Sequence, residues 1–424
     1  MEHNCLRKPN NHCWISKISK VRSYESSKIK INKVYAKGKI KSGLPPVKSL
    51  VEEFKFIFIS LRFMSIDVTE PVEASWNDVK STIFNLANIF LKVFIFITFM
   101  GKMVIQIVFL KAVDETRDEA TVTFLSVLNM IACVSAYKKR REMMYATKQL
   151  SQLFERLINL RNDEIYLRKE KYPFMVYISI SFVFLIVWQV RICFFGWHKL
   201  QLYKFLFRRN LTMELPKPSL YVFWTVQFSE LSYYIITRAI ITLFCTYYIF
   251  TCRFIRIFLR NLLDELYKTS KPEILQKYLN LHEDGMKMMC TFDSQFSFHA
   301  FTLVVLSMIN VFRSGYALAF FEETKRMELC SFICALIFYF SIQIALMISG
   351  IRTNESANET ESKIQDLVKK LRKNYKEMSK LDTDLNEEDY TLSLWKMHIL
   401  DRRLVVSSVG TLLTYGILLG TLGK

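Results

Sequence analysis

The chain has 424 residues, of which 51% are hydrophobic and 14% aromatic, and its net charge is +19. This apolar and aromatic content exceeds that of an ordinary soluble domain and indicates an integral membrane protein. The 11 glycines form neither a dinucleotide fingerprint nor a phosphate loop, and no two of the six histidines have metal-ligand spacing. The sequence therefore predicts no enzyme, no catalytic residues, no cofactor and no metal site.

The N-terminal region is polar and basic. Residues 1–53 form a tail without an apolar core of signal-peptide length, and we expect it in the cytosol. The apolar run that follows is interrupted by Lys55 and Arg62 and is too short to cross a bilayer. We therefore expect 54–82 to be a re-entrant or interfacial lead-in to a membrane domain at 83–424.

The remainder of the chain contains seven apolar segments of membrane-helix length, each with few charges. The last one holds 19 residues without a charge, which corresponds to a helix of about 28 Å. The predicted fold is an all-α bundle of seven membrane helices, with its two termini on opposite sides. The segments are 84–109, 121–137, 174–195, 221–252, 296–321, 329–350 and 404–422.

The distribution of basic residues predicts the orientation of this bundle. With the N-terminus in the cytosol, the inner regions hold 43 lysines and arginines and the outer regions hold 10. Positive residues beside membrane helices favour the cytosolic side. We therefore expect the N-terminus inside and the C-terminus outside, and the net charge of +19 reflects topology and contact with anionic lipid, with no nucleic acid needed.

Three sequons test this orientation. Asn210 begins Asn210-Leu211-Thr212 in a predicted outer loop and is a candidate glycosylation site. Asn354 and Asn358 begin two further sequons that fall inside, where they would stay unmodified.

The inner regions contain amphipathic helices. Apolar residues recur every three or four positions from Ile364 to Leu381, and similar spacing follows Arg141 and Arg253. Three such helices, continuing from membrane spans, would form a packed cytosolic layer. They pack either within one subunit or around the axis of an oligomer, and we favour the oligomer.

The last apolar segment has polar positions at helical spacing. Thr411, Thr414, Leu418 and Thr421 are separated by 3, 4 and 3 residues and share one helix face. This face either lines water, or its threonines bond carbonyl groups one turn back and pack against a neighbouring helix.

These features together resemble the insect gustatory receptors, over about 84–422. The last helix of that family carries Thr-Tyr, five apolar residues and then Gln-Phe. Here Thr414-Tyr415 match, Gly416 to Gly420 supply the five residues, and Thr421-Leu422 stand in place of Gln-Phe. The related odorant receptors share the architecture but usually lack Thr-Tyr at this point, so the motif favours the gustatory branch.

The resemblance implies a ligand-gated, nonselective cation channel in the plasma membrane of chemosensory neurons. It implies a homotetramer, or a hetero-oligomer with related receptors, in which the last helices line a central pore for cations. Thr421 replaces the family's pore glutamine, and Leu418 matches a hydrophobic gate position. A ring of leucines closes a pore by dewetting, and threonine hydroxyls do not select one ion.

The resemblance also places a pocket for a small organic tastant in the outer half of each bundle. Aromatic walls with a few hydrogen-bonding groups suit such a ligand, although the same residue types also line membrane interfaces and helix contacts. The candidates are Trp188, Gln189, Trp224, Gln227, Tyr233, Tyr234, Asn310, Tyr316, Tyr339 and Gln343.

Charged residues within the predicted spans are costly and normally have a partner. Arg191, Glu230 and Arg313 all fall at outer depth. We expect Glu230 to pair with one of the two arginines, and the alternative is that these charges recognise a polar ligand.

Two other protein classes compete with a channel. A G-protein-coupled receptor also has seven spans, but its topology would place the basic regions 138–172 and 351–403 outside. A transporter is less favoured, because the sequence shows no internal repeat and few spans broken by glycine or proline.

Overall fold

The computed structural model describes residues 50–63, 79–112, 116–161, 179–180, 183, 186, 217–269, 272–320, 326–374 and 391–422. All of them belong to one compact unit, Lys48–Lys424. Of the predicted basic tail, only 50–53 lie among the described residues.

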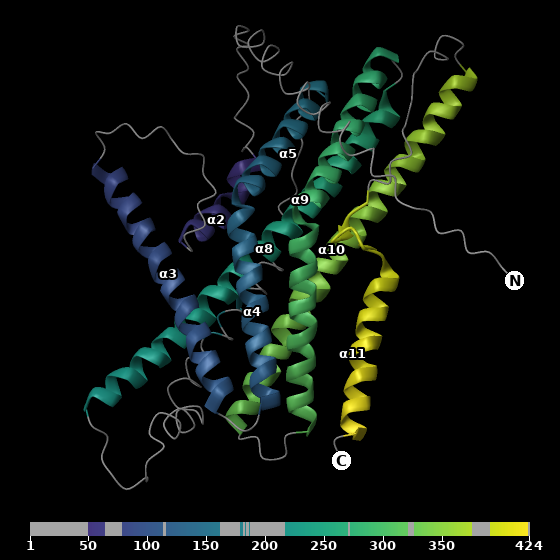
Figure 1. The fold of residues 1–424 in the computed structure, drawn as a ribbon. Coiled ribbons are helices and arrows are strands. Elements are labelled where there is room, and N and C mark those ends of the chain that lie inside the picture. Colours follow the sequence, from purple (N-terminus) through teal and green to yellow (C-terminus); the bar gives the residue numbers. More distant parts are fainter. Residues whose placement is uncertain are drawn as a thin grey trace, which may run out of the picture. The chain divides into compact units, whose positions relative to one another are not determined.

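The described chain is almost entirely helical, which confirms the predicted all-α class (Figure 1). The exception is a hairpin of two-residue strands, β1 and β2, immediately before the last helix. The elements are α2 (Leu50–Phe63), α3 (Val79–Ala112), α4 (Thr116–Lys138), α5 (Arg140–Arg161), α8 (Lys217–Lys268), α9 (Pro272–Phe320), α10 (Arg326–Asn374), β1 (Ser393–Leu394), β2 (His398–Ile399) and α11 (Arg402–Leu422).

Six of the seven predicted membrane segments fall on these helices. They lie in α3, α4, α8, α9, α10 and α11, and only residue 321 of the fifth segment extends past its helix. The third segment, 174–195, lies mostly outside the described residues. By length and apolar composition, three helices within the described ranges are able to cross a membrane, namely α8, α9 and α10, and Thr123–Lys138 in α4 is a shorter apolar helix.

Three long helices form the centre of the unit. α8 has 52 residues, and α9 and α10 have 49 each. At 1.5 Å per residue each is more than about 70 Å long, over twice the thickness of a bilayer core. α10 packs along both α8 and α9, and side chains such as Phe244, Tyr248 and Phe292 are completely buried between them. The helices therefore continue well beyond the apolar segments, as the amphipathic spacing predicts.

The other amphipathic helix of the inner regions also packs within the chain. α5 follows α4 after a turn at Lys139 and contacts both α8 and α9. Met143, Leu150 and Leu157, which recur at seven-residue spacing, are buried. The predicted packed layer is therefore formed within one chain, and contacts around an oligomer axis stay a prediction.

The short helix α2 is attached to this layer by aromatic residues. It contacts α5 and α8, and Phe54, Ile57 and Leu61 are buried on one face. The Phe54 ring lies 5.6 Å from the Tyr247 ring and 5.5 Å from the Phe254 ring. Such ring pairs add to the stabilisation from apolar burial. That α2 is a re-entrant or interfacial element stays a prediction.

A continuous apolar surface lies on α3. An exposed apolar row of this size on a soluble protein would be a binding or aggregation site, whereas hydrocarbon chains of lipid cover it in a membrane. This surface and the three long apolar helices indicate a membrane protein. The exposed residues are Leu86, Ile89, Phe90, Val93, Phe96, Ile97, Met100, Val104 and Ile107.

Phe54→Ala tests the attachment of α2. The Phe54 side chain is fully buried, so its truncation leaves a cavity and lowers the free energy of unfolding by about 3–5 kcal/mol. Thermal denaturation of the purified protein measures this loss. The control is Ile59→Ala in the same helix, because Ile59 is 43% exposed and its truncation has a much smaller effect.

Candidate functional site

The last helix, α11, begins at a well-defined cap. The backbone N–H of Leu404 donates to the Asp401 carboxylate at 2.8 Å, which makes Asp401 the N-cap residue. Arg402 then donates to the Glu355 carboxylate at 2.6 Å and links the start of α11 to α10. From this anchored start, α11 continues for 21 residues to Leu422, about 32 Å at 1.5 Å per residue.

The predicted stripe lies on one continuous helix. Thr411 and Thr414 are exposed, and Thr414 donates to the carbonyl of Gly410 at 2.9 Å. The bond one turn back is therefore present at Thr414, and its side chain also remains accessible. The backbone at Leu418 and Thr421 continues the same helix, which places all four positions on one face, while their side chains lie outside the description.

The described side chains of α11 pack against the chain along one side. Its contacts are with α9 and α10, as Figure 1 shows, and Leu404, Val405 and Ser408 face that core. Val406, by contrast, is 72% exposed. Within the described residues, the side of α11 that carries Val406, Thr411 and Thr414 is therefore accessible in a single chain.

The hairpin joins α11 to α9 and α10. Ser393 donates twice to the Asp293 carboxylate of α9, from its backbone N–H at 2.6 Å and from its hydroxyl at 2.8 Å. The tip residue Trp395 packs its ring 5.3 Å from the rings of Phe298 and Phe301. These contacts attach the segment that precedes α11 directly to α9.

Asn354 of α10 holds the other side of the hairpin. Its amide donates to the carbonyls of Leu392 and Leu400 at 2.9 and 3.0 Å, and its carbonyl accepts the N–H of Leu392 at 2.7 Å. One side chain therefore satisfies three backbone groups at the base of the hairpin, and it is 5% exposed. Gly350, one turn earlier, leaves the space that Leu400 fills, because a Cβ there would lie 2.4 Å from the Leu400 Cδ1.

The structure distributes the predicted ligand-pocket residues over several environments. Tyr233 is buried and donates its hydroxyl to the carbonyl of Ser126 at 3.0 Å. The Asn310 amide donates to Leu306 within its own helix. Trp224 is 42% exposed, whereas Gln227 is buried. Polar groups of Tyr233 and Asn310 are thus used for internal hydrogen bonds.

The remaining pocket candidates differ in their burial and in their hydrogen bonds. Tyr339 is fully buried, and within the described ranges its hydroxyl has no hydrogen-bond partner. Gln343 is also fully buried and lies next to α11, with its amide nitrogen 3.5 Å from the Ser408 hydroxyl. Tyr234 and Tyr316 are half-buried. Trp188, Gln189, Arg191 and Asn210 lie outside the described residues.

The intramembrane ion pair differs from the predicted one. Glu230 accepts a hydrogen bond from the Lys102 ammonium at 2.6 Å, and the Lys102 side chain is only 5% exposed. The described partner of Glu230 is therefore Lys102, and Arg313 is exposed. A contact of Glu230 with Arg191 stays a prediction, because Arg191 lies outside the described residues. Lys102 lies on α3, and α3 packs directly against α8. The contact between these two helices therefore determines the partner of Glu230, and the depth of a residue within its predicted span does not reveal this contact.

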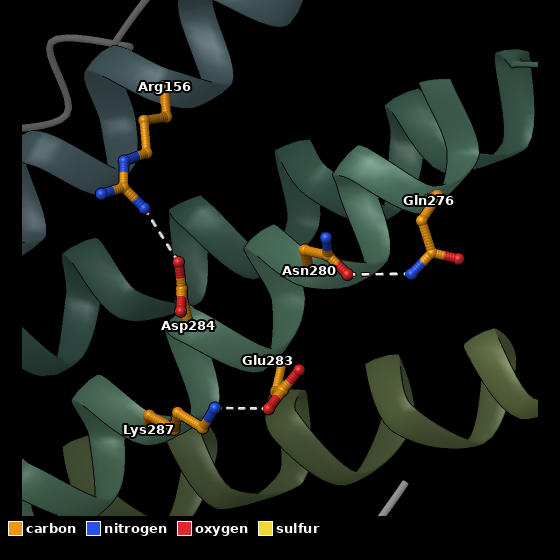
Figure 2. Close-up of polar contacts among 6 residues, drawn as sticks. All are labelled: Arg156, Gln276, Asn280, Glu283, Asp284 and Lys287. Carbon is orange, nitrogen blue, oxygen red and sulfur yellow. Dashed lines mark hydrogen bonds and ion pairs between the residues drawn. The ribbon is translucent and has the colours of Figure 1, made fainter. Parts of the chain in front are cut away.

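A polar groove that the sequence analysis missed lies between α5 and α9. It has a volume of about 350 Å³ and is bridged by Arg156, which donates to Asp284 at 2.8 Å (Figure 2). On α9, Gln276 donates to Asn280 at 2.9 Å, and Lys287 pairs with Glu283. Both side chains of the Arg156–Asp284 pair are about half exposed, and exposed pairs contribute little to stability.

Two solved structures of the insect olfactory receptor OR5 from Machilis hrabei are similar to this chain. The first has a TM-score of 0.57 and 17% sequence identity, covering 87% of this chain and 98% of the receptor chain. The second, in complex with eugenol, has a TM-score of 0.50 and 15% identity, covering 88% and 98%. No protein-family model and no curated protein sequence matches the chain.

The chain has the fold of an insect olfactory receptor. This olfactory-receptor fold confirms the resemblance to insect chemoreceptors at the level of architecture. The assignment to the gustatory branch stays a prediction.

Asn354→Ala tests the attachment of the hairpin. The variant leaves the buried N–H of Leu392 and the carbonyl of Leu400 without their partner, at a cost of about 1–3 kcal/mol for each unsatisfied group, whereas the Leu392 carbonyl still accepts from the Leu400 N–H. We expect faster hydrogen exchange of the amides in 391–400. The matched control is Asn358→Ala, one turn further along α10, because Asn358 is exposed. Unchanged exchange in Asn354→Ala would contradict this role.

Glu230→Gln tests the ion pair. The substitution removes the negative charge that Lys102 contacts in a buried site, and we expect a destabilisation of about 3–5 kcal/mol and reduced surface expression. The double variant Lys102→Met/Glu230→Gln removes both charges and recovers expression. Surface biotinylation measures both variants, and normal expression of Glu230→Gln with altered agonist preference would instead indicate a role in ligand recognition.

Proposed function

We propose that the chain is a subunit of a ligand-gated, nonselective cation channel of the insect chemoreceptor type. The observation that carries the proposal is the one-sided packing of α11 within an olfactory-receptor fold. A membrane helix that contacts its own chain on one side has a second surface available for other subunits and for a pore.

The chemistry of that second surface suits a pore. The exposed hydroxyl-bearing residues Thr411 and Thr414 interrupt an otherwise apolar helix, so one face is wettable. Four copies of α11 around an axis would place four equivalent faces toward water, and a homotetramer or a hetero-oligomer with related receptors satisfies this symmetry. Leu418, one turn after Thr414, would then form a ring of leucines that closes the pore by dewetting, and Thr421 lies beyond it.

The direction of the helices supports the proposed orientation. The ends of α3, α9 and α11 lie at one end of the unit, together with the starts of α4, α8 and α10 (Figure 1). The opposite end carries the long polar continuations of α8 and α10. With the excess of basic residues in those regions, this arrangement favours the N-terminus in the cytosol and the C-terminus outside, in the plasma membrane.

Two observations support the class of ligand: the ligand of the similar olfactory receptor, and the Thr-Tyr pair in α11. The similar olfactory receptor is known in complex with eugenol, which supports a small organic molecule as the ligand of this chain. Thr414-Tyr415 favours the gustatory branch, so we propose a tastant and expression in chemosensory neurons. The buried ring of Tyr339 on α10 contacts Arg238 of α8, which supports a pocket between these two helices.

Leu418→Ala tests the channel. Replacing the gate leucine widens and wets the closed pore, so we expect a constitutive cation leak in whole-cell recordings of cells that express the chain alone. Wild type should give a current evoked by sugars, bitter compounds or amino acids that persists when G-protein signalling is blocked. The control is Val406→Ala, an exposed position of α11 off the stripe, which should not leak.

Surface labelling accompanies these recordings. A current that disappears when G-protein signalling is blocked would support a G-protein-coupled receptor, and saturable uptake without conductance would support a transporter. Silence of Leu418→Ala with the protein at the surface would contradict a pore gated at this residue.

A further inference from the structure

Arg238 is a buried cation in the middle of a predicted membrane span. It lies on α8 and is 9% exposed, and its Nε and Nη1 atoms have no hydrogen-bond partner among the residues that the structure describes. Its guanidinium lies over the ring of Tyr339, with its central carbon 4.3 Å from the ring centroid. Stacking on an aromatic ring holds the plane of a guanidinium and leaves its N–H groups free to donate at the edge.

The surroundings of Arg238 add further unpaired polar groups. The Tyr339 hydroxyl and the Thr242 hydroxyl are both buried without a partner within the described ranges. Thr242 follows Arg238 by four residues on α8 and therefore shares its helix face. Three side chains with hydrogen atoms to donate thus lie on the facing helices α8 and α10. Buried polar groups are normally hydrogen-bonded, so a cluster of this kind indicates a missing acceptor.

The charges around Arg238 also indicate a missing anion. Glu230, the acidic residue within this part of α8, is bonded to Lys102 at 2.6 Å. Arg313, whose charge also acts on Arg238, is positive as well. The described part of the bundle therefore has an excess of positive charge, and an intramembrane cation without a counter-charge is costly and marks a functional site.

We propose that Arg238 binds the carboxylate of an organic anion. The inference rests on the proposed function, because it assigns the ligand class of the receptor's own pocket. A carboxylate accepts two parallel hydrogen bonds from the guanidinium edge and neutralises its charge, and the Tyr339 hydroxyl donates a third. The apolar part of the ligand would contact the rings of Tyr339 and Tyr234.

Matched acids and esters test this proposal with the full-length protein purified into lipid nanodiscs. The probes are hydrocinnamate and octanoate, each compared with its methyl ester, and the measurement is the ligand-induced rise of the thermal denaturation midpoint. At least one acid should raise the midpoint, while its ester raises it less. Arg238→Met should weaken binding of that acid about 10-fold or more, because a charge-assisted pair is lost.

The unliganded variants distinguish recognition from a structural role. Arg238→Met removes a buried charge without a counter-charge, so its unliganded midpoint should equal or exceed that of wild type. The control is Arg313→Met, an exposed cation that should keep at least half of the acid-induced shift. Arg238→Lys retains the charge but loses the two-pronged geometry, and it should bind the acid with intermediate affinity.

Several results would overturn the proposal. These are no shift with either acid, equal shifts with acid and ester, a shift that persists in Arg238→Met, or an Arg238→Met protein with a lower unliganded midpoint. The experiments can reject the acid-binding proposal without rejecting the proposal that the chain is a channel. A leak in Leu418→Ala without acid binding preserves the channel and rejects the ligand class, whereas acid binding without any current preserves the ligand class.

Discussion

The structure depends on the packing of α8, α9 and α10, three helices more than twice as long as the hydrocarbon core of a bilayer is thick. In hydrocarbon, apolar side chains gain little by leaving lipid, so contacts within the membrane rely on close packing and polar bonds. Beyond the predicted spans the same helices bury Phe258, Leu262 and Met289 away from water, where the hydrophobic effect is strong. The water-exposed layer therefore supplies much of the stability that keeps the membrane part assembled, and α2 and α5 add to this layer.

Within the described residues, the hydrogen bonds that attach α11 to this framework lie at its beginning. Asp293 and Asn354 hold the hairpin, Asp401 caps the helix, and Arg402 reaches Glu355. Among the described side chains of α11 after Ser408, Thr414 bonds within its own helix. A helix fixed at one end pivots more readily than one that is packed along its whole length, which suits an element that opens and closes a pore.

Local sequence patterns sufficed for the helices but not for their partners. Apolar stretches and amphipathic spacing predicted α3, α4, α8, α9, α10 and α11, since both signals depend on neighbouring residues only. The partner of Glu230 depends on the rotation of α3 against α8, and depth along a span suggested an arginine instead of Lys102. The hairpin was missed because two-residue strands are too short for an alternating pattern, and the role of Asn354 arises from residues 38 and 46 positions away.

The buried position of Asn354 has a consequence for biogenesis. Asn354 belongs to a sequon, and glycosylation takes place on the lumenal side before folding is complete. A chain inserted upside down would expose this asparagine to the modifying enzyme, and a sugar on its amide would prevent the bonds to Leu392 and Leu400. Such a chain could not attach its last helix. The amide nitrogen of Asn354 can therefore hold the hairpin or carry a sugar, but it cannot do both.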